Sequence, residues 1–410
     1  MPGHLATTPR MVKVADSLAA AGHDVRVVSA GFTAWARESD ERLAGRRPWK
    51  WTVVEHGREQ APFVHATTGV RRHLARTMAL NALPALSWWA STRALSRVHN
   101  ELVARGLHEP CDFVYGGSLG GLAVAAEIGE RQGVPFAIDL EDLHTAESIA
   151  SDAALQHALA RRVLERVIPR AAFVTTSSEC IAERYAEQFG RRPAVLHNVF
   201  PLPAKPPELT SHEGPLRLYW FSQTIAPSRG IEDMVAAVFA AGISAEITLR
   251  GRPHADFTAQ IARRIHEEMR RTAAPTPVVT LHVEPPADPD RMIELAAAHD
   301  IGFASEHEPV ENRQLCLTNK VFTYLAAGNA IAMGDTRAQR HLAGQLGEAA
   351  FLYRPGEIEP LAEWLRHLSV DRTARGRARE AAWQHAVRRW NWHHDAEEGQ
   401  LLSLVARAVA

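Results

Sequence analysis

The sequence predicts an α/β protein of two domains, each a parallel β-sheet covered by helices. Short β-branched runs alternate with helix-forming segments along the whole chain, which is the pattern of βαβ units. Near the middle, the proline-dense segment PLPAKPP at 201–207 interrupts this alternation. Proline fits neither a helix interior nor a central strand, so the segment indicates a linker. Two such domains would face each other across a cleft at the carboxyl ends of their strands.

The first half opens with a loop and a helix. Thr7 or Thr8 can cap this helix, Pro9 suits its first turn, and Gly22 ends it. The next segment, 24–29, supplies three valines, which is typical of a buried parallel strand. We expect further strands over 112–116, 136–140, 172–177 and 194–196, and helices over 119–131, 155–166 and 179–189.

The first strand of the first domain is missing from this pattern. In a doubly wound sheet that strand lies at the centre, but only Met1 and Pro2 precede the opening loop. We therefore expect a short apolar, β-branched run upstream in the coding frame, and a stop codon directly before Met1 would contradict this expectation. If the chain starts at Met1, the loop with Gly3 and His4 is tethered on one side only and should be the least ordered part of the site.

The second half repeats the alternation after the linker. We expect its strands over 216–221, 246–250, 278–282, 301–304, 330–333 and 349–353, with helices over 230–241, 288–299 and 319–327. The predicted domains are therefore 1–200 and 201–385, and a terminal segment, 386–410, follows them.

Composition excludes several classes of protein. The chain has 410 residues, 46% of them hydrophobic and 23% charged, which excludes a disordered or fibrous protein. Its formal net charge of -1 offers no basic field for nucleic acid, so we expect no nucleic-acid partner. Three cysteines far apart indicate neither a disulfide framework nor a zinc site. Without a leader or a long apolar run, we expect a soluble cytoplasmic protein, and no feature defines its oligomeric state.

Two glycine-containing loops of the first half each precede a predicted helix. One contains Gly3 and His4, and the other, at 116–121, contains Gly117 and Ser118. Bare backbone N–H groups at a helix start can hold an oxyanion or a hydroxyl-rich ligand. An ordinary tight turn is the alternative explanation for these glycines.

The segment from Asp139 to His144 ends a buried strand with three carboxylates, Asp142 among them, and an imidazole. Such a cluster is costly unless it faces a polar site. A metal-binding carboxylate pair is one alternative, but no further histidine or carboxylate is placed by the sequence to complete a coordination shell. We therefore predict no metal site.

In the second half, a segment that begins with Ser222 and Gln223 and ends with Arg229 and Gly230 joins a strand to a helix. A guanidinium beside helix N–H groups is a natural site for a diphosphate. A solvent-exposed arginine at an ordinary turn is the alternative. Arg250 ends the next strand and is a second cation near this position.

A second pair of polar segments supports the same site. Glu306, Glu308 and Glu311 follow a buried strand, and the segment LTNK, ending at Lys320, starts the next helix. The carboxylates could bind sugar hydroxyls, while the helix start and the lysine could bind phosphate.

In order and spacing, these pieces resemble a known family, the retaining GT-B glycosyltransferases of the large family-4 group. The opening residues GHLATTPR and AAGHDV are similar to the glycine loop and the "aGHeV" signature of the acceptor domain, and VTTSS with HNVFP resembles the passage into the linker. RGIE at 229–232 is similar to the loop that holds the donor diphosphate, and NKVFTYLAAG at 319–328 is close to "NKlfEYlaaG". WNW at 390–392 matches the start of a terminal helix that crosses back over the first domain.

The resemblance implies a hexosyltransferase that moves a sugar from a nucleotide sugar to an acceptor hydroxyl with retention, in the synthesis of bacterial glycans, glycolipids or natural products. It implies a metal-independent reaction without a further cofactor. His144 would approach the transferred sugar, and Arg229 with Lys320 would neutralise the leaving diphosphate. The expected donor site comprises Ser222, Gln223, Arg229, Gly230, Arg250, Glu306, Glu311, Thr318, Asn319, Lys320 and Thr323; the expected acceptor site comprises Gly3, His4, Gly117, Ser118 and Asp142.

The chain departs from the family pattern at three positions. Many members carry two glutamates seven residues apart, the second of which binds the nucleotide ribose; here Leu315 and Thr323 stand near those positions. Glu306, Glu308 and Glu311 are therefore competing substitutes. Gln223 occupies the position of a usual arginine, so the diphosphate site would depend more on Arg250.

Two other functions and one further binding partner, a membrane surface, remain open. A GT-B sugar-nucleotide epimerase, or a catalytically silent nucleotide-sugar-binding partner, would use the same fold. Arg71, Arg72 and Arg76, with Trp88 and Trp89, belong to a helix-forming region over 70–106 that could make weak peripheral contact with a membrane. Ordinary packing is the favoured explanation for that region.

Overall fold

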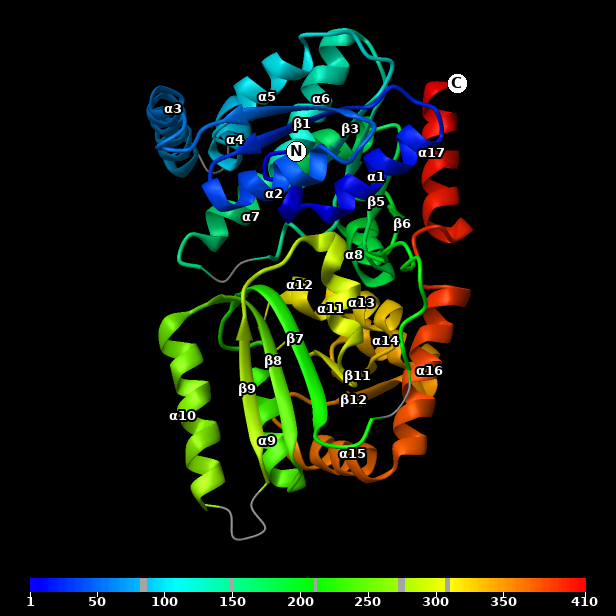
Figure 1. Ribbon diagram of the computed structural model, residues 1–410. Coiled ribbons are helices and arrows are strands. Elements are labelled where there is room, and N and C mark those ends of the chain that lie inside the picture. Colours follow the sequence, from blue (N-terminus) through cyan, green and yellow to red (C-terminus); the bar gives the residue numbers. More distant parts are fainter. Residues whose placement is uncertain (82–86, 148–149, 210–211, 272–276, 307–309) are drawn as a thin grey trace. The chain divides into compact units, whose positions relative to one another are not determined.

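The computed structural model describes residues 1–81, 87–147, 150–209, 212–271, 277–306 and 310–410. The chain forms two compact units (Figure 1). Unit 1 comprises residues 1–197, 310–312 and 395–410, and unit 2 comprises residues 198–309 and 313–394. Unit 1 therefore also takes up a short piece of the second half and the C-terminal segment. Glu308 lies outside the described residues.

Unit 2 is a doubly wound parallel sheet of six strands. Its spatial order is β12-β11-β10-β7-β8-β9, with every neighbouring pair parallel. The first strand, β7, therefore lies between the second and the fourth, as expected for this topology. The strands are β7 (Leu216–Ile225), β8 (Ala245–Pro253), β9 (Val279–Glu284), β10 (Ile301–Ala304), β11 (Ala330–Gly334) and β12 (Ala350–Tyr353).

Helices cover both faces of this sheet and enclose its core. Leu216, Leu218 and Trp220 of β7 are buried in one cluster with Val235 and Val238 of α9. Burial of such side chains on both faces explains why the strands are near-continuous apolar runs. The helices are α9 (Ile231–Ala241), α10 (Ala255–Arg271), α11 (Met292–Ala297), α13 (Asn319–Ala327), α14 (Arg337–Leu346), α15 (Ile358–Val370) and α16 (Arg372–Arg388).

Unit 1 contains two parallel sheets. One pairs β1 with β2, and the other has the order β3-β4-β5-β6. Helices α5 and α6 pack on β1 and β3 respectively and on each other. The strands are β1 (Arg26–Gly31), β2 (Lys50–Glu55), β3 (Val114–Gly117), β4 (Phe136–Asp139), β5 (Val174–Thr176) and β6 (Ala194–Val195).

The helices of unit 1 connect these strands, and the last one returns from the end of the chain. Ser178 caps α8 by accepting a hydrogen bond from the N–H of Ile181, and Gly190 ends that helix in the left-handed region. The helices are α1 (Pro9–Ala20), α2 (Ala34–Ala44), α3 (Pro62–Asn81), α4 (Trp88–Leu95), α5 (His99–Gly106), α6 (Leu119–Gln132), α7 (Ala153–Val167), α8 (Glu179–Phe189) and α17 (Gln400–Val409).

The sequence does not predict two elements near the start. Strand β2 is half-buried and mixes Lys50, Trp51 and Thr52 with two valines, so it lacks the apolar run of its neighbours. Helix α2 has four buried residues, two of them the polar Ser39 and Asp40. An element with so weak an apolar pattern gives little sequence signal.

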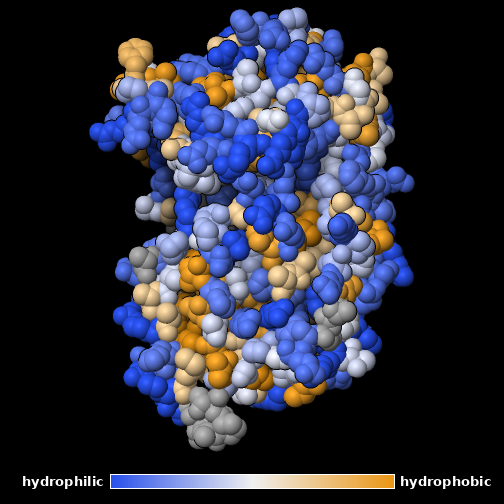
Figure 2. All heavy atoms as spheres, in the orientation of Figure 1, coloured by the Kyte–Doolittle hydropathy of each residue, from blue (hydrophilic) through white to orange (hydrophobic). Residues whose placement is uncertain are grey.

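Helix α3 has its large apolar side chains on the outside. Phe63, Val70, Leu74 and Met78 are exposed, while the buried residues of this helix are Thr68, Ala75 and Ala79. Figure 2 shows apolar spheres at the upper left, where Figure 1 places α3. Within the described part of the chain, no helix combines the length and the apolar character needed to cross a membrane.

Candidate functional site

Three charged side chains predicted for the donor site meet in unit 2. Glu306 follows β10, Arg229 precedes α9, and Lys320 lies in the first turn of α13. Lys320 Nζ lies 2.6 Å from Glu306 Oε1, and Arg229 Nη1 lies 3.7 Å from Glu306 Oε2. They meet because β7 and β10 are neighbours in the sheet, so the loops at their carboxyl ends lie close together.

The Glu306 carboxylate is a buried charge held by cations. Its side chain is 1% exposed, and that of Lys320 is 7% exposed. Burial alone would raise the pKa of Glu306, but Lys320, Arg313 and Arg229 outweigh that effect and lower it. The ammonium of Lys320 also lies 5.4 Å from the centre of the Trp220 ring. The cluster therefore keeps two cations at the start of two helices, where an anion is favoured.

Gly230 fixes the loop that carries Arg229. Its φ is 77°, and an added Cβ would lie 2.5 Å from Cβ of Ser305, which directly precedes Glu306. Only glycine fits both constraints. Ser228, two residues earlier, adopts φ 63°, a conformation that costs a non-glycine residue free energy and is concentrated at functional sites. The loop is therefore held tightly against the end of β10.

The start of α13 adds polar groups that have no hydrogen-bond partner among the described residues. Thr318 precedes the helix, and its hydroxyl is buried and makes no hydrogen bond to the residues that the structure describes. Asn319 and Lys320 form the first turn, whose N–H groups have no partner within the helix. Thr323, one turn further, is 1% exposed. Its short side chain therefore lies in the packed interior of unit 2.

Other residues predicted for the donor site make their contacts with residues outside this cluster. Ser222 and Gln223 belong to the irregular end of β7, where the pairing with β8 shifts register. Arg250 Nε donates to the Tyr219 hydroxyl at 3.0 Å, and its Nη1 donates to the Pro285 carbonyl at 2.8 Å. Arg250 thus connects β7, β8 and the segment after β9, rather than joining Glu306.

Glu311 differs more from the prediction, because it belongs to unit 1. Its Oε1 lies 2.8 Å from Arg184 Nε of α8. The neighbouring Asn312 donates from Nδ2 to Asp142 Oδ1 at 3.1 Å and accepts from the N–H of Leu143 at 2.8 Å. These contacts hold residues 310–312, and Glu311 with them, against the loop after β4.

The carboxylate cluster after β4 is organised by Arg10 of α1. Arg10 donates from Nε and Nη2 to the two oxygens of Asp139, at 2.7 and 2.8 Å, and from Nη1 to the Leu196 carbonyl. Thr175 adds a third hydrogen bond to Asp139 at 2.6 Å. Burial opposes the charge of Arg10, but Asp139 outweighs this and raises its pKa. Asp139 is therefore committed to Arg10 and is not a good metal ligand.

His144 lies on the same loop and is 5% exposed. Its Nδ1 lies 3.0 Å from Glu147 Oε2, while its Nε2 makes no hydrogen bond within the described residues. Burial disfavours the charged imidazole, but Glu147, Asp142 and Glu141 outweigh it and raise the pKa of His144. The Tyr185 hydroxyl accepts from the His144 N–H and donates to the Asp142 carbonyl, which fixes the loop.

Glu141, the middle carboxylate of the predicted cluster, and Lys13, which the sequence does not single out, are two further charges that interact with Arg10 and Asp139. Burial and Asp142 raise the pKa of Glu141, whose backbone adopts φ 55°. Burial and Arg10 lower the pKa of Lys13 to about 7. Arg10 and Lys13 are three residues apart on the buried face of α1. The sequence signal for this pair was the position of two basic residues, Arg10 and Lys13, on the apolar face of a helix.

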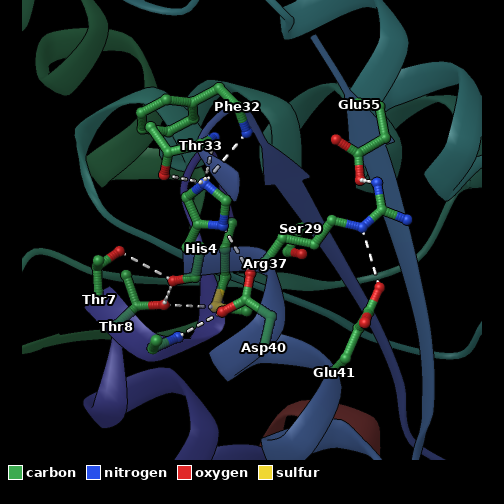
Figure 3. A network of polar contacts seen from close by, with 12 residues as sticks. His4, Thr7, Thr8, Ser29, Phe32, Thr33, Arg37, Asp40, Glu41 and Glu55 are labelled. Atoms are coloured by element: carbon green, nitrogen blue, oxygen red, sulfur yellow. Dashed lines mark hydrogen bonds and ion pairs between the residues drawn. The ribbon is translucent and has the colours of Figure 1, made fainter. Parts of the chain in front are cut away.

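His4 belongs to a closed network rather than to an open site (Figure 3). Its Nε2 accepts from the N–H groups of Phe32 and Thr33, at 3.1 and 3.2 Å, so Nδ1 carries the proton and donates to Asp40 at 2.7 Å. Asp40 also accepts from the Ala6 N–H. The ring therefore joins the opening loop to the loop after β1 and to α2. Acceptor binding by this side chain would require these bonds to break.

The loop after β3 carries the remaining residues predicted for the acceptor site. Gly117 ends β3, and an added Cβ would lie 2.2 Å from the sulfur of Met11. Ser118, which precedes α6, adopts φ 60° and ψ 147°, a region that glycine normally occupies. Ser118, Glu141 and Ser228 are the non-glycine residues of positive φ in the described chain, and all three follow a strand. Strain is thus concentrated at the strand ends.

Comparisons with known proteins agree with this fold. Residues 7–202 match the family described as a glycosyl transferase 4-like domain. No sequence among curated proteins matches the chain. Among solved structures, Anabaena HepE in complex with UDP is 14% identical in sequence, with a TM-score of 0.63. The alignment covers 100% of this chain and 96% of the HepE chain.

Two other structures are similar over the same extent. Sucrose-phosphate synthase of Thermosynechococcus elongatus is 13% identical, covers 98% of this chain and 94% of its own, and has a TM-score of 0.62. A trehalose-6-phosphate synthase is 12% identical, with a TM-score of 0.62, and the alignment covers 98% of this chain and 96% of the synthase chain. The chain therefore has the GT-B fold, and its residues 7–202 match a glycosyl transferase 4-like domain. These findings confirm the predicted fold class and the resemblance to family-4-like GT-B glycosyltransferases.

Proposed function

We propose that the protein is a retaining glycosyltransferase that moves a hexose from a nucleotide sugar to an acceptor hydroxyl. The observation that carries this proposal is the cluster of Glu306, Lys320 and Arg229 at the starts of α9 and α13. Two cations and two sets of helix N–H groups suit a diphosphate. UDP is the first nucleotide to test, because HepE structures contain UDP or UDP-glucose.

In the proposed reaction the bond between the anomeric carbon and the diphosphate oxygen breaks, and the acceptor oxygen bonds to the same face of the sugar. The departing phosphate takes the proton of the acceptor hydroxyl. Lys320 and Arg229 would stabilise the negative charge that develops on this leaving group. The trehalose-6-phosphate synthase structure comes from work on glycosyl transfer with retention, which supports retention here.

We further propose that His144 contacts a hydroxyl of the transferred sugar. Its Nε2 is the ring nitrogen without a hydrogen bond in the described structure, and Glu147 favours its protonated form. A protonated Nε2 can donate a hydrogen bond to a hydroxyl or stabilise developing negative charge. We further propose that the reaction needs neither a metal ion nor a resident cofactor, since the two cations already supply positive charge at the leaving group.

The test is a panel of UDP-, GDP- and TDP-sugars, scored for nucleotide release and transferred product, with and without a chelator. Lys320→Ala and Arg229→Ala should weaken donor binding, while Arg354→Ala, at a 72% exposed arginine of the same unit, should not. His144→Ala should lower turnover more than binding, and exposed His73→Ala is its control. Nucleotide release without transferred product would favour an epimerase, and no binding of any nucleotide would contradict the enzyme proposal.

We also propose weak peripheral contact between α3 and a membrane carrying anionic lipid. The helix has three arginines and no carboxylate over its twenty residues, and it exposes a row of large apolar side chains. Arg71 and Arg76 pair with Glu101 and Asp152, so we expect weak binding. Sedimentation with phosphatidylglycerol vesicles should detect it, and Leu74→Ser with Met78→Ser should abolish it. Equal sedimentation of both proteins would contradict this contact.

A further inference from the structure

The loop over 140–146, which carries His144, is held by α8 and by the short segment 310–312. From α8, the Tyr185 hydroxyl accepts a hydrogen bond from the His144 N–H at 3.0 Å. From the short segment, Asn312 contacts the loop through its side chain and its backbone. All of these residues belong to unit 1. The backbone around His144 is therefore fixed by two anchors.

Asn312 contacts the loop at three points. Its Oδ1 accepts from the N–H of Leu143 at 2.8 Å, and its Nδ2 donates to Asp142 Oδ1 at 3.1 Å. Its own N–H donates to the Ala146 carbonyl at 3.2 Å. The residue is buried, with 5% of its surface exposed. Asn312 therefore brackets His144, because it contacts residues that precede it and a residue that follows it.

An amide is the side chain that fits both neighbours of Asn312 at once. The Leu143 N–H needs an acceptor and the Asp142 carboxylate needs a donor, and an amide carries both kinds of group. An aspartate at 312 could accept from Leu143, but it would place a second carboxylate against Asp142, where like charges repel. Alanine would leave the buried N–H without this partner, which is costly. The loop therefore determines the residue type at 312.

The segment that carries Asn312 is continuous in sequence with the donor cluster. Three residues, 307–309, separate Glu306 of unit 2 from the segment 310–312, and the chain returns to unit 2 at Arg313. Arg313 is one of the cations that lower the pKa of Glu306. One short stretch of chain thus contributes a carboxylate to the donor cluster and an amide to the loop after β4.

We propose that Asn312 is a positioning residue for sugar transfer, which holds the loop after β4 so that the His144 imidazole stays in place for the transferred sugar. This inference rests on the proposed role of His144. The hydrogen bonds that carry it are made with this loop rather than with Lys320 or Arg229, so Asn312 should affect turnover and not donor affinity. A displacement of about 1 Å at a reacting group can lower a rate about a hundredfold.

The test measures hydrogen exchange, UDP affinity and turnover in Asn312→Ala. Amides over 143–146 should exchange at least about tenfold faster than in the wild type. Turnover should fall at least about tenfold, while the Kd for UDP stays within about twofold of the wild-type value. Asn391→Ala is the matched control, because Asn391 is 7% exposed and its Nδ2 donates to the Ala386 and Val387 carbonyls. It should change neither exchange over 143–146 nor turnover.

A double substitution distinguishes this hydrogen bond from a general loss of stability. In Asn312→Asp combined with Asp142→Asn, the amide and the carboxylate change places. The new carboxylate still accepts from the Leu143 N–H, and it now also accepts from the amide at 142. Asn312→Asp alone should speed exchange over 143–146 at least as much as Asn312→Ala, and the double variant should restore slow exchange.

Unchanged exchange or unchanged turnover in Asn312→Ala would overturn the proposal, and so would a UDP affinity that falls as much as turnover. Fast exchange in the double variant would overturn it too. If the wild type transfers no sugar from any donor, the proposed function fails, and exchange over 143–146 still decides whether Asn312 holds the loop.

Discussion

Replacing Gly230 by alanine tests whether the loop before α9 positions the donor cations. Gly230 has φ 77°, and its new Cβ would lie 2.5 Å from Ser305 Cβ and 3.3 Å from the Ser305 carbonyl oxygen. The left-handed conformation costs about 1–2 kcal/mol for alanine, and overpacking at a rigid position adds about 1–3 kcal/mol. We therefore expect Gly230→Ala to lower the free energy of unfolding by about 2–5 kcal/mol.

Gly242, at the other end of α9, is a matched control. It has φ 66°, and an added Cβ would meet nothing within 4 Å, so Gly242→Ala incurs only the backbone cost of about 1–2 kcal/mol. Chemical denaturation measures both free energies. Calorimetry with UDP should show weaker binding for Gly230→Ala, because the loop shifts Arg229, and unchanged binding for Gly242→Ala. Equal stability losses, or equal UDP affinity in both variants, would contradict a positioning role for Gly230.

Three further predictions concern buried charges. Glu306→Gln should destabilise the free protein by about 3–5 kcal/mol, because it leaves Lys320 buried without its carboxylate partner. UDP should raise the melting temperature of this variant more than that of the wild type, and an equal shift would contradict the prediction. Arg10→Ala should cost about 3–5 kcal/mol in denaturation experiments by leaving Asp139 unpaired, and a loss below about 1 kcal/mol would contradict the assignment. Burial lowers the pKa of the Met1 amine from 8.0 to about 5, so the unfolded state binds more protons between these two values. Stability should therefore rise by up to about 4 kcal/mol from pH 5 to pH 8 in denaturation experiments, and acetylation of this amine should remove the rise.

Two inner strands of unit 2 could be predicted closely because they are buried on both faces. Strand β10 was predicted at its observed bounds, and β11 within one residue. Half-buried β2 was missed, since Lys50 and Thr52 interrupt its apolar pattern. The signal for a parallel strand is the continuous run of apolar side chains, and an edge element that shares only one face with the core does not carry it.

The contacts within the candidate site could be predicted where its residues follow neighbouring strands. Arg229, Glu306 and Lys320 were each expected at the donor site, and the pairing of β7 with β10 brings them together. Arg10 could not be assigned, because its partner Asp139 is 129 residues away and a helical arginine is normally exposed. The contacts of Glu311 in unit 1 could not be predicted for a related reason. Sequence does not reveal that residues 310–312 leave unit 2 and pack in unit 1.

Diphosphate binding by the cluster of Lys320, Arg229 and Glu306 can be measured by calorimetric titration of UDP into the wild-type protein, Lys320→Ala and the control Arg354→Ala. We expect saturable binding by the wild type and the control. Binding by Lys320→Ala should be at least about tenfold weaker, because a charge-assisted hydrogen bond contributes about 1.5–3 kcal/mol. Equal UDP affinity in Lys320→Ala and the wild type would contradict it.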